Sequence, residues 1–400
     1  MTLRTRDLVC LSTVDWDFLW GRHQELMSRF AGDGKRVLYI EPLGIRSARV
    51  EDLPRIVKRL WRRLRAGSRG LRSPIPNIYV YSPLALPFQG PGWVRRLNSW
   101  MLSRSVCSLM KRLGFSRPIV WTFYATQTAL NLIGTIDHQV LIYDCIDDIA
   151  NNPKGAVSGY QDLEQQLITW ADLVFTTSAA LALERKAMNP RVYHVPPGVY
   201  AERFVGVYTV PEDIATIRHP RLGFFGGLDE RIDQDLIAYV AQSRPDWCIV
   251  FIGNVRTKIE TLPVYPNIFF LGQKRLDELA PYLHALDVLI IPYVVNQYTK
   301  HIYPNKVFEC LAVGKPTVVT YLPELQDLDG LIRLTDGPED FVAAIEDALA
   351  EDDPDLVARR QQMARENTWG VRYQQIMGHI EAVVSEKFIA STPRRLSCES

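Results

Sequence analysis

Short apolar runs alternate with longer amphipathic stretches over most of the chain. Apolar runs bounded by polar or turn-forming residues predict buried strands, and stretches whose apolar positions recur every three or four residues predict helices. The strands predicted in the first half are 8–12, 36–40, 78–81, 119–123, 140–143, 173–176 and 192–195. A helix is predicted at 22–30, between the first two strands. This alternation is typical of βα units that build a parallel sheet.

A second alternating set follows Pro196-Pro197-Gly198. Its predicted strands are 221–225, 247–252, 268–271, 288–291, 316–320 and 331–334. A helix is predicted at 338–350, and helical sequence follows from about 354 to 388. We therefore predict an α/β protein with two domains, 1–200 and 201–370, followed by a helix at 371–388 and a flexible tail at 389–400. Because open parallel sheets bind ligands beyond the carboxyl ends of their strands, we expect a ligand cleft between the domains.

The composition narrows the class of protein. Of the 400 residues, 47% are hydrophobic and 23% are charged, which excludes a disordered chain, a fibrous repeat and a multi-span membrane protein. The N-terminus lacks the long apolar stretch of a secretory signal. The six cysteines form no CxxC pair, which predicts buried thiols in a reducing compartment. We expect a cytoplasmic protein, with a peripheral position on the inner face of the membrane left open.

Charge is distributed unevenly along the chain. Residues 1–200 carry 26 Lys+Arg and 16 Asp+Glu, net +10, whereas residues 201–400 carry 20 and 29, net −9. The basic excess gathers in the runs 46–72 and 94–117, which include Trp61 and Trp100. Basic amphipathic helices with tryptophan lie on anionic membrane surfaces, so these runs predict a membrane contact. A solvated helix is the alternative; no nucleic-acid module accompanies the runs, and nucleic acid is not an expected partner.

The stretch 301–325 combines several ligand-binding signals. Pro304 suits the start of a helix, Gly314 suits its end, and the predicted strand 288–291 precedes it. A helix start at the carboxyl end of a strand can bind an anion. Glu309, on the same helix, can accept hydrogen bonds from a ribose diol. The alternative is a solvated helix in an ordinary α/β unit.

This stretch resembles the signature of nucleotide-sugar-dependent glycosyltransferases of the GT-B fold, especially family 4. Their Pro-x-Lys-x-x-Glu-x-x-Ala-x-Gly-x-Pro pattern is matched here by Pro304, Lys306, Glu309, Ala312, Gly314 and Pro316. Residues 222–228 resemble the first strand and glycine loop of the family's donor domain, and 249–253 its second strand. Residues 270–272 are similar to the turn that reads the nucleobase, and 368–372 to the start of the closing helix.

The resemblance implies two Rossmann-like domains facing a cleft, with a C-terminal helix that crosses back to the first domain. It also implies donor binding by Gly226, Gly227, Arg231, Gly253, Gly272, Gln273, His301, Asn305, Lys306 and Glu309. The donor would be a UDP- or GDP-linked sugar, used as substrate without a cofactor or metal ion, and transfer would retain the anomeric configuration. The chain departs from the pattern where His301 replaces a glutamate that contacts the donor sugar, and where Arg231 stands for an Arg-plus-Lys pair.

Two groups of polar residues in the first domain are further candidates. Asp144, Asp147 and Asp148 follow a predicted strand, and their mutual repulsion predicts a raised pKa for at least one of them, as a catalytic proton acceptor needs. Helix capping is the alternative for these acids, which precede a polar turn at 151–153. The loop after the first strand offers acceptor or diphosphate contacts at Asp15, Trp16, Arg22 and His23, for which an ordinary structural role is the alternative.

Together these features predict a hexosyltransferase-class enzyme that moves a sugar from a nucleotide sugar to a polysaccharide or lipid-linked acceptor. A similar Tyr-Asp-x-x-Asp-Asp element recurs in bacterial relatives that build cell-surface polysaccharides. Two alternatives remain at this stage. A nucleotide-sugar 2-epimerase of the same fold would need no acceptor, and a non-catalytic binding subunit would account for His301 in place of an acid.

Overall fold

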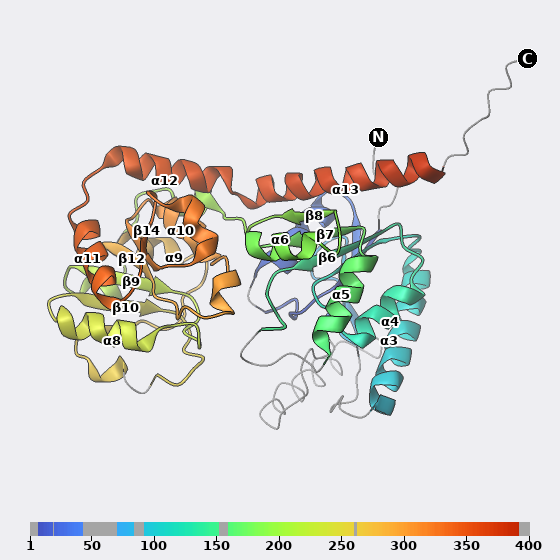
Figure 1. Ribbon diagram of the computed structural model, residues 1–400, viewed down its shortest axis with the longest axis horizontal. Helices are drawn as coiled ribbons and strands as arrows, with labels where there is room; N and C mark the ends of the chain where they lie inside the picture. The colour runs from blue at the N-terminus through green and yellow to red at the C-terminus, as the bar shows by residue number, and fades with distance from the viewer. Residues whose placement is uncertain are drawn as a thin grey trace, which may run out of the picture. The chain divides into compact units, whose positions relative to one another are not determined.

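The computed structural model describes residues 7–18, 20–42, 70–83, 92–151, 159–259 and 262–391. The chain divides into two compact units, each an α/β unit as predicted (Figure 1). Unit 1 contains Met1–Pro196 together with Tyr373–Ser400, and unit 2 contains Pro197–Arg372. The sequence placed the corresponding boundaries at 200/201 and 370/371.

Unit 1 is built on a sheet that has eight strands among the described residues, in the order β3-β4-β2-β1-β5-β6-β7-β8. These strands are β1 (Asp7–Leu11), β2 (Arg36–Ile40), β3 (Leu71–Arg72), β4 (Ile78–Tyr81), β5 (Ile119–Thr122), β6 (Val140–Cys145), β7 (Leu173–Thr176) and β8 (Val192–His194). Neighbouring strands are parallel except for β3, which pairs antiparallel with β4. The strand order reverses at β1, which lies between β2 and β5, and this is where open α/β sheets bind ligands.

Helices cover both faces of this sheet. They are α1 (Arg22–Gly32), α3 (Gly92–Leu113), α4 (Gln127–Thr135), α5 (Tyr160–Trp170), α6 (Ala179–Lys186) and α13 (Trp369–Ser391). Alternate residues of each strand point to opposite faces. Val9 and Leu11 pack with residues of α3 to α6, and Leu8 and Cys10 pack with residues of α1 and α13. The C-terminal helix, red in Figure 1, therefore completes the core of unit 1.

Unit 2 has a parallel sheet of six strands in the described residues, in the order β11-β10-β9-β12-β13-β14. They are β9 (Arg221–Phe225), β10 (Cys248–Ile252), β11 (Ile268–Phe270), β12 (Val288–Ile291), β13 (Thr317–Thr320) and β14 (Arg333–Thr335). The helices are α7 (Glu212–Ala215), α8 (Gln234–Ser243), α9 (Leu279–His284), α10 (Lys306–Val313), α11 (Pro338–Leu349) and α12 (Pro354–Glu366). Short 3₁₀ turns are η2 (Ala201–Phe204), η3 (Leu262–Val264), η4 (Thr299–His301) and η5 (Pro323–Leu328). The order reverses at β9, between β10 and β12.

The helical sequence predicted from about 354 to 388 forms two helices, because the chain breaks between α12 and α13. The separate helix predicted at 371–388 lies within α13. At the break, Val199 N donates to Asn367 O over 3.1 Å, and Trp369 N donates to Val199 O over 3.2 Å. The backbone of Val199 thus satisfies the Asn367 carbonyl and the Trp369 N–H, which in a continuous helix would bond to other residues of that helix. A Cβ on Gly198 would lie 2.7 Å from Trp369 N, so the close approach requires glycine. The predicted tail also begins too early, because α13 continues to Ser391; residues 392–400 lie outside the described part.

Other expectations concern the cysteines and the membrane. Cys10, Cys145, Cys248 and Cys310 are buried free thiols, as predicted, and Cys107 is a partly buried free thiol. Within the described ranges, no helix combines the length and hydropathy needed to cross a bilayer. The sequence did not predict β3, which is only two residues long and takes its place by pairing with β4.

Candidate functional site

In unit 2, the loops that follow β9, β10 and β12 are hydrogen-bonded to one another at the point where the strand order reverses. Gly226 N donates to Ile252 O over 2.8 Å, and Leu228 N donates to Asn254 O over 2.9 Å. Val294 N, after β12, donates to Arg231 O over 2.8 Å. The structure thus gathers the predicted glycine loop, Arg231 and the segment leading to α10 at one edge of the sheet.

Gly253 decides how closely two of these loops approach. Its φ is +156°, and a Cβ at this position would lie 1.8 Å from Gly226 O. No side chain fits such a distance, so glycine is required for the loop after β10 to rest on the glycine loop. On the other side of that loop, a Cβ on Gly226 would lie 3.5 Å from the Lys306 side chain. The predicted donor residues Gly253, Gly226 and Lys306 are therefore neighbours in the folded structure, with Gly226 between the other two.

Four side chains form what we call the Tyr293 cluster: Asp229, Arg231, Tyr293 and Lys306. Lys306 Nζ donates to the Tyr293 hydroxyl over 2.9 Å and lies 4.0 Å from the centre of the Phe224 ring. Arg231 pairs with Asp229 through Nε–Oδ1 (2.8 Å) and Nη2–Oδ2 (2.6 Å), and its guanidinium lies 5.5 Å from the centre of the Tyr293 ring. Asp229 therefore orients Arg231 at the edge where an anion would bind.

The two cations of the cluster favour the negatively charged form of the groups beside them. Burial alone would raise the pKa of Tyr293, but Lys306 and Arg231 outweigh burial and hold that pKa below its ordinary value. Burial would likewise raise the pKa of Asp229, but the hydrogen bonds and charge of Arg231 lower it, and Lys306 contributes in the same direction. With two cations against one carboxylate, the cluster carries a net positive charge, which suits a diphosphate.

Glu309 lies on α10, three residues after Lys306. Its side chain is partly buried, and within the described residues no hydrogen bond or ion pair engages its carboxyl group. Burial raises its pKa to about 7, while Lys306 and Arg203 act in the opposite direction. A carboxyl group without a protein partner is available to accept hydrogen bonds from ligand hydroxyls. This is the role that the sequence predicted for Glu309 toward a ribose diol.

The remaining predicted donor residues lie in the loops of the same unit. Gly272 follows β11 with a φ of +68°, and the next residue, Gln273, accepts a hydrogen bond from Asn254 Nδ2. His301 ends η4, and Asn305 directly precedes α10 without capping it through its side chain. Gln273 is thus connected to the loop after β10, the one that Gly253 begins.

Sequence reasoning missed Asp229 and Tyr293. Asp229 has a local signal, since it stands two residues before Arg231, close enough for a carboxylate to pair with the guanidinium. Tyr293 follows the apolar run 288–291, where an aromatic residue looks like part of the strand. Its contact with Lys306 depends on the connection between β12 and α10, which the local pattern does not specify.

In unit 1, Arg22 and Asp144 form a buried ion pair at the end of β6. Arg22 Nε lies 3.1 and 3.0 Å from the two Asp144 oxygens, and Nη1 donates to Val195 O over 3.1 Å. Asp144 is fully buried, and burial raises its pKa while Arg22 opposes the shift. The raised pKa is as predicted, but the cause is burial and not repulsion by neighbouring acids.

The other two acids follow β6 in a turn. Asp148 accepts hydrogen bonds from Asn151, from the backbone N over 3.4 Å and from Nδ2 over 2.8 Å. Asp148 thus fixes a turn and does not cap a helix, because no helix begins in the described residues that directly follow it. Asp147 is partly buried, and its carbonyl accepts from Ile149 N over 3.0 Å.

His23 is buried at the start of α1. Its Nε2 lies 2.7 Å from Thr13 Oγ1, and its ring centre lies 3.8 Å from that of Phe123, the residue after β5. Burial lowers its pKa to about 3, with a smaller contribution from Arg22. The imidazole is therefore neutral at physiological pH.

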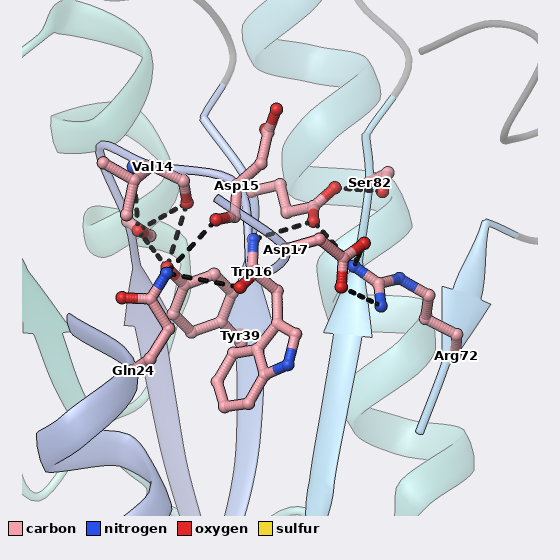
Figure 2. Close-up of polar contacts among 10 residues, drawn as sticks. Val14, Asp15, Trp16, Asp17, Gln24, Tyr39, Arg72 and Ser82 are labelled. Atoms are coloured by element: carbon pink, nitrogen blue, oxygen red, sulfur yellow. Dashed lines mark hydrogen bonds and ion pairs between the residues drawn. The ribbon is translucent and has the colours of Figure 1, made fainter. Parts of the chain in front are cut away.

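Figure 2 shows the loop that joins β1 to α1, with the residues that hold it. Glu41 Oε1 accepts from Trp16 N and from Arg72 Nη2, each over 3.1 Å, and Arg72 also pairs with Asp17 at 2.9 Å. Gln24 Nε2 donates to the carbonyls of Asp15 and Trp16, each over 3.3 Å. Trp16 is only 5% exposed, so its ring supports the loop from inside.

The described residues include no group of three or more His, Cys, Asp or Glu side chains arranged to hold a metal ion. In unit 2, Lys306 and Arg231 carry positive charge that could neutralise a phosphate ligand.

Comparisons with known proteins agree with this picture. Residues 219–351 match the family model described as glycosyl transferases group 1. The chain is 30% identical over 266 residues to TuaH of Bacillus subtilis, whose name describes it as a teichuronic acid biosynthesis glycosyltransferase. That match covers 59% of this chain and 66% of TuaH, slightly less than two thirds of its length.

Solved structures share the fold at low sequence identity. Sucrose-phosphate synthase from Thermosynechococcus elongatus has a TM-score of 0.70 at 15% identity, covering 96% of this chain and 100% of its own. HepE of Anabaena in complex with UDP has a TM-score of 0.63 at 15% identity, covering 94% of this chain and 99% of its own. Both are similar to this chain in fold, and the fold class predicted from the sequence is confirmed.

Proposed function

We propose that this protein transfers a sugar from a nucleotide sugar to a polysaccharide or lipid-linked acceptor, and the match of residues 219–351 to the group 1 glycosyltransferase model supports this proposal. The observation that carries the proposal is the net positive Tyr293 cluster next to the partly buried, unpaired Glu309, at the edge of the unit 2 sheet where the strand order reverses. HepE, which shares the fold, has been solved with UDP bound.

In the proposed mechanism, Lys306 and Arg231 contact the donor diphosphate. Preorganised cations at the leaving group stabilise the charge that develops as the glycosidic bond breaks. Asp229 holds Arg231 in place, and Glu309 accepts hydrogen bonds from the ribose hydroxyls. Because two side chains supply the positive charge, we expect transfer to proceed without a metal ion. The resemblance to family 4 enzymes implies that transfer retains the anomeric configuration. Loss of activity in excess EDTA, restored by Mn²⁺, would refute the metal-independent part.

We propose that unit 1 binds the acceptor. The ion pair of Arg22 with Asp144 and the neutral His23 stiffen the carboxyl edge of its sheet. The name of TuaH connects that protein with teichuronic acid, a further reason to test cell-wall polymers or their lipid-linked precursors as acceptors.

Helix α3 supports a peripheral position on an anionic membrane. Trp93, Leu97 and Trp100 are 66%, 37% and 59% exposed, and their spacing places them on one face of the helix. Exposed basic residues lie on the same helix: Arg95, Arg96, Arg104, Lys111 and Arg112. The 22 residues of α3 include no acid. Exposed tryptophans among cations, without acids, are typical of helices that lie on anionic lipid.

The run 46–72 contributes less to this argument than the sequence suggested. Most of it lies outside the described residues. Arg72, which is described, pairs with Asp17 and Glu41 and is therefore not free to bind a phosphate headgroup. The membrane proposal thus rests on α3.

The decisive experiment has two steps. The first is a thermal-shift panel of UDP, GDP and their sugars, in which a ligand at a hundred times its dissociation constant stabilises the chain by about 2.7 kcal/mol. Lys306→Ala and Glu309→Ala should abolish the shift, whereas exchange of an exposed residue on α12, such as Arg359, should not. In the second step the donor that binds is incubated with and without lipid-linked or polymeric acceptors.

The outcomes separate the proposal from its alternatives. Release of nucleotide only with an acceptor supports a transferase. Conversion of the free nucleotide sugar to its 2-epimer without an acceptor would establish the epimerase instead. Donor binding with neither product under any acceptor would favour a non-catalytic binding subunit, for which His301 in place of an acid is the motive. No shift with any nucleotide would overturn donor binding itself.

A further inference from the structure

The loop between β1 and α1 presents a tryptophan ring that is exposed and yet held in place. Trp20 is 46% exposed, but its indole N–H donates to Glu25 Oε2 over 3.0 Å. The other Glu25 oxygen accepts from Arg29 Nε over 2.6 Å, and Glu25 itself is 2% exposed. The carboxylate that orients the indole is therefore itself fixed within α1.

A second contact restrains the same ring. Trp16 lies edge-on against Trp20, with ring centres 5.7 Å apart and planes at 76°. Trp16 in turn stands at 84° to Tyr39, 5.1 Å away, and Glu41 holds its backbone N–H (Figure 2). An aromatic ring fixed both at its N–H and by a buried neighbour has little rotamer freedom left to lose when a ligand packs on it.

The charges of the loop favour a neutral, hydroxylated ligand. Asp15 is partly buried and Asp17 is exposed, and Figure 2 shows the Asp15 carboxylate directed away from the Asp17–Arg72 pair. Arg72 is already paired with Asp17 and Glu41. Phosphate groups would be repelled by these acids, which distinguishes the loop from the acid-free α3. Carboxylates accept hydrogen bonds from hydroxyl groups, and the indole offers a surface to C–H groups.

We propose that Trp20 is the platform on which a neutral pyranose ring of the acceptor glycan stacks. A pyranose has an apolar C–H face that can pack on the indole and hydroxyls that can donate to carboxylates of the same loop. The position agrees with this role, because the loop follows β1, where the strand order of the unit 1 sheet reverses. The assignment of the glycan as an acceptor rests on the proposed transferase function; the sugar site itself does not.

The test uses the full chain labelled with 5-fluorotryptophan and observed by ¹⁹F NMR, with Trp20→Phe identifying the Trp20 signal. The probes are cellotetraose and chitotetraose. We expect the Trp20 signal to move on titration, while that of Trp170, which is 47% exposed on α5 of the same unit, stays unchanged. Trp20→Ala should weaken binding about tenfold, as loss of one aromatic contact can. Glu25→Ala keeps the ring but frees it, and should weaken binding less.

UDP and GDP titrations of the same samples separate this inference from the donor proposal. If a nucleotide binds but neither tetrasaccharide moves the Trp20 signal, the platform is refuted while donor binding stands. If a tetrasaccharide moves the signal but no nucleotide binds, the platform stands and the transferase does not. A Trp20 signal that responds only to dodecylphosphocholine micelles would make the ring a lipid contact and refute the sugar platform.

Discussion

Glu309 is partly buried, and it is the side chain that we propose binds the ribose hydroxyls of the donor. Burial raises its pKa to about 7, so its charge changes within the physiological range. Only the carboxylate accepts hydrogen bonds with both oxygens. We therefore expect nucleotide-sugar affinity, measured by calorimetry, to increase between pH 6 and pH 8, and Glu309→Gln to bind more weakly with no such increase. Equal pH profiles of the two proteins would contradict the assignment of Glu309.

The same group predicts a stability effect of known sign. A folded pKa above the unfolded value contributes stability that is present below pH 4.5 and is lost as the pH rises through about 7. Without ligand, Glu309→Gln should therefore be more stable than the wild type at pH 8, by about 1–3 kcal/mol, and similar to it at pH 4.5. Thermal unfolding of both proteins at the two pH values checks this prediction. A Glu309→Gln variant that is less stable than the wild type at pH 8 would show that burial does not destabilise the carboxylate.

His23 gives the opposite dependence on pH. Its folded pKa of about 3 lies below the ordinary 6.5, so its contribution is present above pH 6.5 and is lost as the pH falls toward 3. Between pH 7 and pH 4 the wild type should lose roughly 2–3 kcal/mol more stability than His23→Gln. Denaturant unfolding across this range measures the difference, and parallel curves would mean that His23 is accessible to protons.

At the scale of elements, the proposed donor site in unit 2 depends on how closely the loop after β10 approaches the loop after β9. Gly253→Ala would place a methyl group 1.8 Å from Gly226 O, so the two loops must separate. We expect loss of donor binding and destabilisation of unit 2 beyond the roughly 1 kcal/mol that a strained alanine costs.

A matched control isolates this close contact. Gly330 has a φ of +80°, and a Cβ added there would have nothing within 4 Å, so Gly330→Ala carries backbone strain without overlap. It should retain donor binding in calorimetry. If both variants behave alike, backbone strain and not loop contact explains the glycine at 253.

At the scale of the molecule, the charge split between the halves of the chain, +10 against −9, predicts that one unit meets an anionic surface. Replacing Arg95, Arg96 and Arg104 of α3 with Ser should release the protein from anionic liposomes at low salt, since each cation contributes about 1 kcal/mol near such a surface. Co-sedimentation measures the loss, and donor affinity should not change.

Exposed charges outside α3 provide the control for this prediction. Arg359→Ser with Arg365→Ser removes two exposed cations from α12 in unit 2 and should leave liposome binding intact. Binding of the wild type should also fall steeply with salt, because exposed charges are screened beyond about 8 Å at physiological ionic strength. Failure of the wild type to sediment at low salt would leave α3 as an ordinary solvated helix.

Much of the fold followed from local patterns. Buried strands of parallel sheets are continuous apolar runs, and Gly and Pro mark where they stop. The runs 36–40, 78–81, 173–176, 221–225 and 288–291 coincide with observed strands for this reason. The sequence alone also predicted the motif around Lys306 and Glu309 that we propose binds the donor, because its residues share one helix and the turn before it.

Contacts between residues far apart in the sequence became visible only in the tertiary structure. Arg22 meets Asp144 across 122 positions, so only the folded sheet shows that this acid is half of a buried ion pair. β3 exists because β4 pairs with it, and α12 ends because Val199 occupies the backbone groups of the break. The exposed but restrained Trp20 likewise depends on Glu25 and Trp16 meeting around it. A local pattern reports which face of an element is apolar, but which partner satisfies a polar group is settled only when distant segments pack together.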